Sequence, residues 1–284
     1  MTTPLEPAWV GLVDDAAIFP PGGAPLHDAT ATYAARSAED GAELIGTFVL
    51  RDTDLPLVRG FGGRLSVVVT GGAGQVAGPA GLCARLGLTL AGLEIALRDL
   101  DDLVGNARRV VAALDDARST GRLADDVATF VELPHVASTG SWLAAADEVA
   151  AAGLGLKFRT GGLEASAFPA AHALAGWIDA ALDRETAFKC TAGLHHAVRH
   201  TTTEGFDEPV DQHGFLNVLV ATRLLFDGAG VPAAVEALEQ RDGVALAEEA
   251  RALDLAGARR WFTSFGSCDV AQPLADLREL ELAR

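Results

Sequence analysis

The chain contains two lysines, Lys157 and Lys189, and the other 20 of its 22 basic residues are arginines. Each lysine lies in an apolar, strand-like segment, LGLKFR or AFKCT, and a turn of small residues follows each segment. A neutral lysine amine attacks a carbonyl carbon and forms an imine, whereas a guanidinium stays charged near neutral pH and cannot. The matched positions of the lysines therefore favour amine chemistry, with pairing to acids as the structural alternative.

The two segments predict neighbouring strands that bring the amines together. Adjacent strands lie about 4.8 Å apart. A second ammonium and burial both lower the pKa of a lysine, and we expect Lys189 to keep Lys157 neutral in this way. Glu94 and Glu132 lie on two other predicted strands and are the candidate proton relays, or alternatively the partners of the lysines. The small residues expected to leave room for a substrate are Gly161, Gly162 and Gly193.

Histidines form the second group of candidate functional residues. Four of the seven histidines lie between residues 195 and 213. His195 is a candidate general acid or base. These histidines could instead build a metal site, although the HEXXH motif of zincins is absent. Its other ligands would be Glu94, Glu132, His135 and either Asp14 or Asp15, at the ends of other predicted strands. The Gly-Ser turn of FGSCDV could present backbone amides to an anion. The remaining candidate substrate-binding residues are Asp15, His196, His213, Gly266 and Ser267.

Eight short apolar runs, separated by amphipathic helical patterns, are the elements that must position these residues. Continuous apolar runs are typical of parallel strands buried on both faces. Strand and helix alternate along the whole chain, which predicts βαβ units and favours one closed (β/α)8 barrel of the TIM type over residues 1–284, with an open doubly wound sheet as the competitor. Active sites of such barrels lie at the carboxyl ends of the strands. The predicted strands are 9–14, 46–50, 64–70, 92–97, 128–133, 154–159, 187–191 and 260–265.

The long interval between the last two predicted strands indicates an insertion. Its sequence predicts extra helices at about 200–255. Excess length between strands usually belongs to functional loops, so we expect residues 200–244 to form a lid near the mouth of the barrel, with His213 close to the lysines. Arg159, which follows Lys157 by two positions, is expected on the opposite face, where it would pair with an acid between barrel and helix.

The segments LKFRTGG and FKCTAGL resemble the paired lysine motifs on strands six and seven of the deoxyribose-phosphate aldolase family of class I aldolases. The resemblance implies a TIM barrel in which Lys157 forms the Schiff base and Lys189 lowers its pKa. GLEIAL is similar to the family strand that carries an acid, with Glu94 where aspartate is usual. FVELPH resembles the next strand, and TSFGSC resembles the last strand with its small-residue phosphate turn. Phe158 and Arg159 replace the small pair that follows the first lysine in the family.

Composition limits the possible partners. The formal net charge of −17 disfavours nucleic acid and anionic membrane surfaces, and no apolar run is long enough to predict a transmembrane helix. The three cysteines are far apart in the sequence and the first residues have no basic, apolar leader, so we expect a cytoplasmic location. We expect a small-molecule substrate, no cofactor, no metal and a possible homo-oligomer. The alternatives are a metal-dependent hydrolase or lyase using the His and Glu cluster, and a ligand-binding barrel without catalysis.

Overall fold

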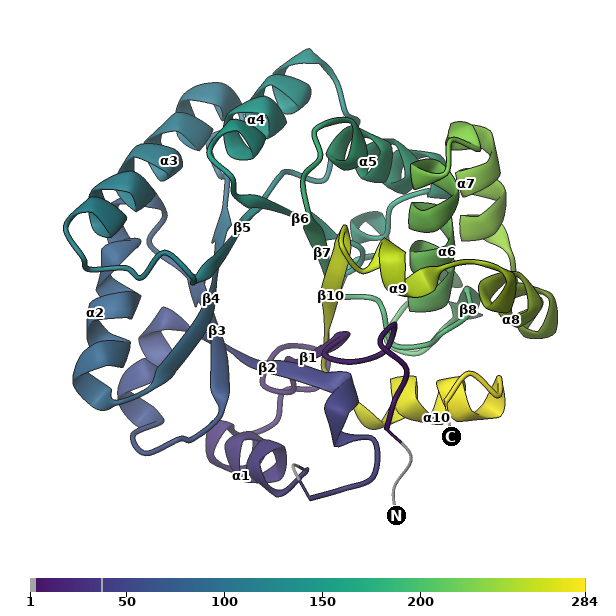
Figure 1. Cartoon of the computed structure of the whole chain (residues 1–284), viewed down its shortest axis with the longest axis horizontal. Coiled ribbons are helices and arrows are strands. Elements are labelled where there is room, and N and C mark those ends of the chain that lie inside the picture. The colour runs from purple at the N-terminus through teal and green to yellow at the C-terminus, as the bar shows by residue number, and fades with distance from the viewer. Residues whose placement is uncertain (1–3, 37, 284) are drawn as a thin grey trace.

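Eight parallel strands close into a barrel in the computed structural model, which describes residues 4–36 and 38–283 (Figure 1). The strand order around the barrel is β1-β10-β7-β6-β5-β4-β3-β2, so the first strand pairs with both the second and the last. The predicted (β/α)8 barrel is thereby confirmed, and the open sheet is wrong. The barrel strands are β1 (Val13–Asp15), β2 (Ile45–Arg51), β3 (Arg64–Val69), β4 (Thr89–Ala96), β5 (Ala128–Glu132), β6 (Gly155–Arg159), β7 (Phe188–Thr191) and β10 (Phe262–Ser267).

Helices surround the barrel on its outside (Figure 1). Their sequences carry ordinary helix signals: Asp102, for example, caps the helix that follows β4 by accepting a hydrogen bond from the Gly105 amide at 2.9 Å. No helix within the described residues is long and apolar enough to cross a membrane. The helices are α1 (Leu26–Arg36), α2 (Ala77–Leu86), α3 (Leu103–Ser119), α4 (Gly140–Ala151), α5 (Ala171–Asp183), α6 (Phe215–Phe226), α7 (Gly230–Glu239), α8 (Gly243–Ala252), α9 (Leu255–Ala258) and α10 (Ala271–Glu279).

The strand boundaries differ from the prediction at both ends of the chain. The first strand was expected from residue 9 but begins at Val13, because the backbone turns before it: the Leu12 amide donates to the Trp9 carbonyl, and Gly11 has a φ of 62°. The last strand runs two residues further than expected, to Ser267. Before β1 the apolar residues begin ahead of the paired segment, and at the end of β10 the pairing continues beyond the apolar run into Gly266 and Ser267, so hydrophobicity alone does not mark the ends of a strand.

An antiparallel hairpin that the sequence did not predict opens the inserted segment. It consists of β8 (His200–Thr202) and β9 (Val210–Gln212), which pair with each other and not with the barrel. Helices α6 to α9 follow it. Since the hairpin lies between the end of β7 and the start of α6, it belongs to the carboxyl end of the barrel. The lid function, and the single-domain organisation with an insertion at about 200–255, remain predictions.

Alternation along β6 separates an apolar outer face from a charged inner one. Phe158 packs outward against Trp142 of α4 and Trp177 of α5. Its neighbours Lys157 and Arg159 therefore both point into the barrel, because residues two apart on a strand share a face. The expectation that Arg159 lies on the opposite face from Lys157 is wrong for this reason.

Candidate active site

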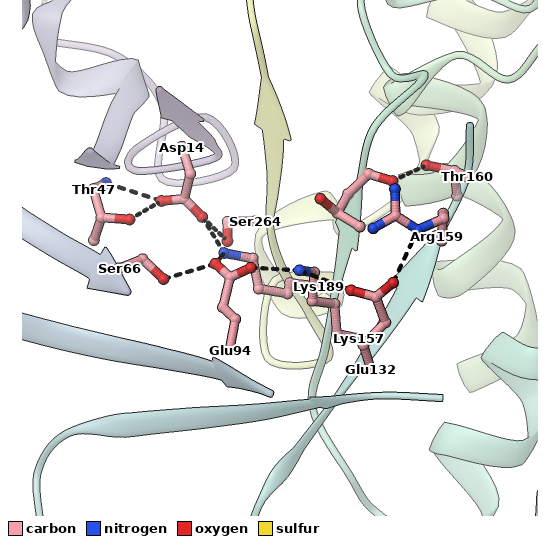
Figure 2. Close-up of polar contacts among 11 residues, drawn as sticks. Asp14, Thr47, Ser66, Glu94, Glu132, Lys157, Arg159, Thr160, Lys189 and Ser264 are labelled. Atoms are coloured by element: carbon pink, nitrogen blue, oxygen red, sulfur yellow. Dashed lines mark hydrogen bonds and ion pairs between the residues drawn. The ribbon is translucent and has the colours of Figure 1, made fainter. Parts of the chain in front are cut away.

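Lys157 lies between two carboxylates inside the barrel (Figure 2). Its Nζ is 2.6 Å from Oε2 of Glu94 on β4 and 3.0 Å from Oε2 of Glu132 on β5. The other oxygen of Glu132 accepts a hydrogen bond from Nε of Arg159 at 2.9 Å. Glu132 thus binds the amine and the guanidinium with its two oxygens.

Lys189 extends the same network toward β1. Its Nζ donates to Oδ2 of Asp14 and to Oε1 of Glu94, both at 2.7 Å. Glu94 therefore lies between the lysines and contacts each amine with a different oxygen (Figure 2). The like charges of the two lysines are separated by a carboxylate rather than facing each other directly.

Three hydroxyl side chains, from β2, β3 and β10, complete the network around Asp14 and Glu94. Ser66 on β3 donates to Oε1 of Glu94 at 2.7 Å, and Ser264 on β10 donates to Oδ2 of Asp14 at 2.6 Å. The backbone amide and hydroxyl of Thr47 on β2 donate to the other oxygen of Asp14, at 2.9 and 2.7 Å. The carboxylates are held in one orientation by these neutral donors, whichever amine is charged.

Strand register explains why these side chains meet. Lys157 and Lys189 are Cα partners on β6 and β7, and the same row continues to Glu132 on β5 and to Ser264 on β10. Register partners on neighbouring strands share a face of the sheet, so the side chains of this row lie side by side in the lumen. Gly155 on β6 leaves space beneath this row: a Cβ on it would lie 2.5 Å from the Phe130 ring, so glycine lets that ring fill the lumen.

The charges of the network stabilise one another. Burial alone would raise the pKa of Glu94, but the Lys157 and Lys189 ammonium groups outweigh burial and hold this pKa below its ordinary value. Burial would also raise the pKa of Glu132, but Lys157 and Arg159 together outweigh burial and lower this pKa. Burial would lower the pKa of Lys189, but Asp14 and Glu94 outweigh it and raise that pKa. Lys189 is therefore a cation held between two carboxylates.

The predicted residue Asp15 faces away from this network. Its carboxylate pairs with Arg36 of α1 at 3.2 Å and accepts a hydrogen bond from the Ala17 amide at 3.0 Å. Burial raises its pKa, against the opposing effects of the Ala17 amide and Arg36. Asp14, one residue earlier, occupies the lumen position instead.

His195 and His196 lie in the loop after β7 and contact the last strand and helix. Nδ1 of His195 is 3.4 Å from Oγ of Ser267, at the end of β10, and burial together with the neighbouring histidines lowers the pKa of His195. Nδ1 of His196 is 3.1 Å from Oδ2 of Asp276 on α10, and its ring lies edge-on to His200 at 4.5 Å. Neither ring is hydrogen-bonded to the lysine network.

His213 is fully buried beside the hairpin, with both ring nitrogens engaged. Nε2 lies 2.8 Å from the Pro169 carbonyl, in the loop after β6, and Nδ1 lies 3.0 Å from Nη1 of Arg199. This places His213 at the carboxyl end of the barrel, where it links the loops after β6 and β7. Its pKa is lowered to about 4, first by burial and then by Arg199.

The predicted glycines and the Gly-Ser turn have different surroundings. A Cβ on Gly161 would lie 2.6 Å from Cα of Gly193, whose φ is 74°, so these two glycines let the turns after β6 and β7 touch. A Cβ on Gly162 would lie 2.8 Å from Ala167, whereas one on Gly266 would meet nothing closer than 3.8 Å. Ser267 donates its hydroxyl hydrogen to the Asp269 carbonyl.

The structure thus brings four of the predicted catalytic residues together and adds five others. Lys157, Lys189, Glu94 and Glu132 form one network, whereas His195 lies outside it. Serine inside the apolar runs RLSVVVT and FTSFGS was a usable signal for two of the additions, because a buried hydroxyl needs a partner. Sequence reasoning named Asp14 only as an alternative to Asp15 in a metal site, and it expected Arg159 outside the lumen. The residues that it left out are Thr47, Ser66 and Ser264.

A metal-dependent site would need a group of suitable ligands. Among residues 4–36 and 38–283, no group of three or more His, Cys, Asp or Glu side chains lies close enough together to hold a metal ion. The three carboxylates of the network each contact a lysine amine instead. The metal-dependent alternative has no support from this part of the chain.

No protein-family model and no curated protein sequence matches the chain. Among solved structures, the barrel is similar to the tetrameric deoxyribose phosphate aldolase from Aeropyrum pernix. The TM-score is 0.56 at 13% sequence identity, and the match covers 97% of this chain and 93% of that one. At this identity the likeness shows a shared fold, the TIM barrel, and supports the predicted resemblance at that level.

Proposed function

We propose that this protein is a class I aldolase-like lyase that forms a Schiff base between Lys157 and a small carbonyl substrate. The observation that carries the proposal is the position of the Lys157 amine inside a TIM barrel, at 2.6 and 3.0 Å from two carboxylates. Lys157 lies two residues before the carboxyl end of β6, and active sites of such barrels are built at the carboxyl ends of the strands. Both lysines contact the buried Glu94, but the second partner of Lys157, Glu132, is 13% exposed, whereas the second partner of Lys189, Asp14, is 5% exposed. A substrate therefore reaches Lys157 more readily, and we assign Lys157 as the nucleophile.

The chemistry begins with removal of a proton from Lys157. Glu132 and Glu94 are the acceptors within hydrogen-bond distance. The neutral amine adds to the carbonyl carbon, the carbonyl oxygen leaves as water after taking up two protons, and a protonated imine remains. The bond between the α and β carbons of the protonated imine then breaks: its electron pair forms an enamine, and the β-hydroxyl group gives its proton to a carboxylate of the network and becomes the carbonyl of the released fragment. Protonation of the enamine carbon and hydrolysis of the resulting imine by water release the second product and restore Lys157.

Lys189 contributes electrostatic stabilisation in this proposal. Its ammonium lies 2.7 Å from both Asp14 and Glu94, and the raised pKa keeps it charged. A fixed cation next to Glu94 holds that carboxylate in place and favours its return to the ionised form after it has accepted a proton.

Reductive trapping tests the proposal. The purified protein is incubated with small aldehydes and ketones in sodium cyanoborohydride, and intact mass and peptide mapping locate any adduct. We expect an adduct on Lys157 and none in Lys157→Arg, which keeps a cation between Glu94 and Glu132 but cannot form an imine. Arg98→Gln, an exposed change after β4, is the matched control and should be trapped like the wild type. Adducts confined to Lys189, or none with any carbonyl, would refute the assignment.

Further parts of the proposal concern partners and location. We propose a small-molecule substrate without nucleic acid, a cytoplasmic enzyme, and assembly into a homo-oligomer; the similar Aeropyrum pernix aldolase is a tetramer. The role of His195 as a general acid or base stays a prediction of the sequence. The same holds for the substrate-binding roles of Asp15, Gly161, Gly162, Gly193, His196, His213, Gly266 and Ser267. Light scattering of the purified chain measures the assembly state directly.

A further inference from the structure

We infer that the terminal nitrogens of Arg159 bind the carboxylate of the substrate, so that the carbonyl compound accepted by Lys157 is a short oxo acid. The inference rests on the proposed function and names its substrate class. It depends on the geometry of Arg159, on the charges around the barrel mouth and on the position of Glu132.

Arg159 has donor capacity that the protein does not use. Its Nε donates to Glu132, and within the described part of the chain Nη1 and Nη2 have no acceptor. The side chain is 42% exposed, whereas Lys157 is only 4% exposed. A guanidinium held by Nε presents its remaining edge in a fixed plane, and this planar pair of N–H groups matches the two oxygens of a carboxylate.

Glu132 sets the relation between the anion site and the nucleophile. One of its oxygens is 3.0 Å from the Lys157 amine and the other is 2.9 Å from Nε of Arg159. Lys157 and Arg159 also lie two positions apart on the same face of β6. A molecule whose carboxylate is one or two bonds from its carbonyl carbon spans this short interval, which is the description of a 2-oxo or 3-oxo acid.

The part of the mouth formed by β10 and β1, two and three strands from β6, disfavours an anionic group. Where α10 begins after β10, Oδ1 of Asp269 accepts hydrogen bonds from the Ala271 and Gln272 amides, at 2.8 and 3.3 Å. The amides that would attract a substrate anion at this helix end are therefore already bonded to a carboxylate of the chain. Asp15 lies close enough for the Asp269 charge to contribute to raising its pKa, after burial. A substrate anion is consequently directed to β6.

A second polar group near Arg159 lacks a partner. His135 follows β5, two positions after Leu133, and its Nε2 is buried with no hydrogen-bond partner among the described residues. Burial and then the charge of Arg159 lower the pKa of His135, so the ring is neutral. The surroundings of the guanidinium are thus polar and incompletely satisfied, as expected for a site completed by a ligand.

Pyruvate and pyruvamide, which have nearly the same shape but differ in charge, test the inference. Each is trapped on the wild-type protein with cyanoborohydride at equal concentration, and the initial rates of adduct formation are compared by intact mass. We expect pyruvate to react at least ~10-fold faster, because a bidentate charged contact is lost with the amide. In Arg159→Gln the ratio should fall toward one, in Arg159→Lys it should be intermediate, and in the control Arg98→Gln it should match the wild type.

The possible failures are distinguishable. A wild-type ratio near one, or a high ratio that Arg159→Gln leaves intact, overturns the inference while the aldehyde adducts on Lys157 preserve the proposed function. If the wild type traps neither pyruvate, pyruvamide nor any aldehyde, the proposed function and this inference fail together. The wild-type comparison decides the matter even if Arg159→Gln does not fold, which circular dichroism would reveal.

Discussion

The barrel lumen and the loop around β8 and β9 are both rich in titratable groups, yet they use them differently. In the lumen, side chains from separate strands contact each other: the two lysines share Glu94. In the loop, His213 is within hydrogen-bond distance of a backbone carbonyl and of Arg199, and His196 is within hydrogen-bond distance of Asp276 on a neighbouring helix. The register of neighbouring strands fixes which side chains lie side by side, so several charged groups meet in the lumen. An irregular loop has no such register, and its polar side chains hydrogen-bond the backbone of the loop instead.

The largest expected effect separates the two regions by activity. Glu94→Gln removes the carboxylate between the lysines, so we expect the rate of borohydride trapping on Lys157 to fall by about 10²-fold or more, the range of general acid–base effects. His195→Gln, in the loop, should change the rate by less than ~10-fold. If His195→Gln lowered the trapping rate as much as Glu94→Gln, the loop would take part in the reaction, and the functional difference between the two regions would be refuted.

Two adjacent acids provide the next comparison. Asp14→Asn leaves Lys189 with one carboxylate partner, and we expect the free energy of unfolding to fall by about 3 kcal/mol, as for other broken buried ion pairs. Asp15→Asn should change it by no more than about 1 kcal/mol, since burial already disfavours the charged form of Asp15. Urea titrations at pH 7 measure both values, and equal costs would contradict the different roles assigned to the two side chains.

Acid titration of stability distinguishes the regions by pH. The folded pKa of His213 is about 4, below its ordinary 6.5, so its contribution is complete above pH 6.5 and is lost as the pH falls toward 4. The loss amounts to about 3 kcal/mol, and His213→Gln should remove it. The pKa of Glu132 is lowered from 4.5, so the network loses stability only below that pH.

We would measure the free energy of unfolding of the wild type and of His213→Gln at half-unit steps from pH 7 to pH 4. Wild type should lose stability across the interval and the variant should be flatter. Parallel curves would show that His213 is not the titrating group, and a steep loss beginning only below pH 4.5 would assign the acid sensitivity to the lumen.

The fold was predictable because apolar runs and helical patterns alternate along the whole chain, and the barrel strands follow from them. The positions of Lys157 and Lys189 on neighbouring strands were predictable for the same reason. The hairpin β8–β9 was not, because its strands are three residues each and carry polar side chains such as Thr201 and Asp211. Such short strands have no periodicity to detect.

The choice between Asp14 and Asp15 shows what limited the prediction of the site. In a strand the facing of each side chain depends on where the strand begins, and an error of one residue reverses every face. β1 has three residues, so its own sequence contains no alternation from which to set the phase. For Arg159 the phase was available, since Lys157 lies two positions earlier, and the prediction erred in applying it. The contact of Glu94 with both amines needed the register between strands, which sequence alone does not provide.

The smallest expected effect concerns an ion pair of the loop that has the same chemistry as those of the lumen. Arg241 contacts Asp211 at 2.6 Å, and Arg199 contacts the same carboxylate at 3.1 Å, while Asp211 is 43% exposed. Hydrogen bonds from Arg241 and Thr201 lower the pKa of Asp211 to about 2.

Solvent screens such a pair, so Arg241→Gln should lower the free energy of unfolding by less than about 1 kcal/mol, and Arg199 remains to neutralise the acid. The difference should vanish in 1 M salt, where the screening length is about 3 Å, whereas the cost of Asp14→Asn should persist because its partners are buried. Chemical denaturation with urea at low and high NaCl measures both variants, and a salt-independent cost for Arg241→Gln would show that the loop pair is as protected as the lysine network.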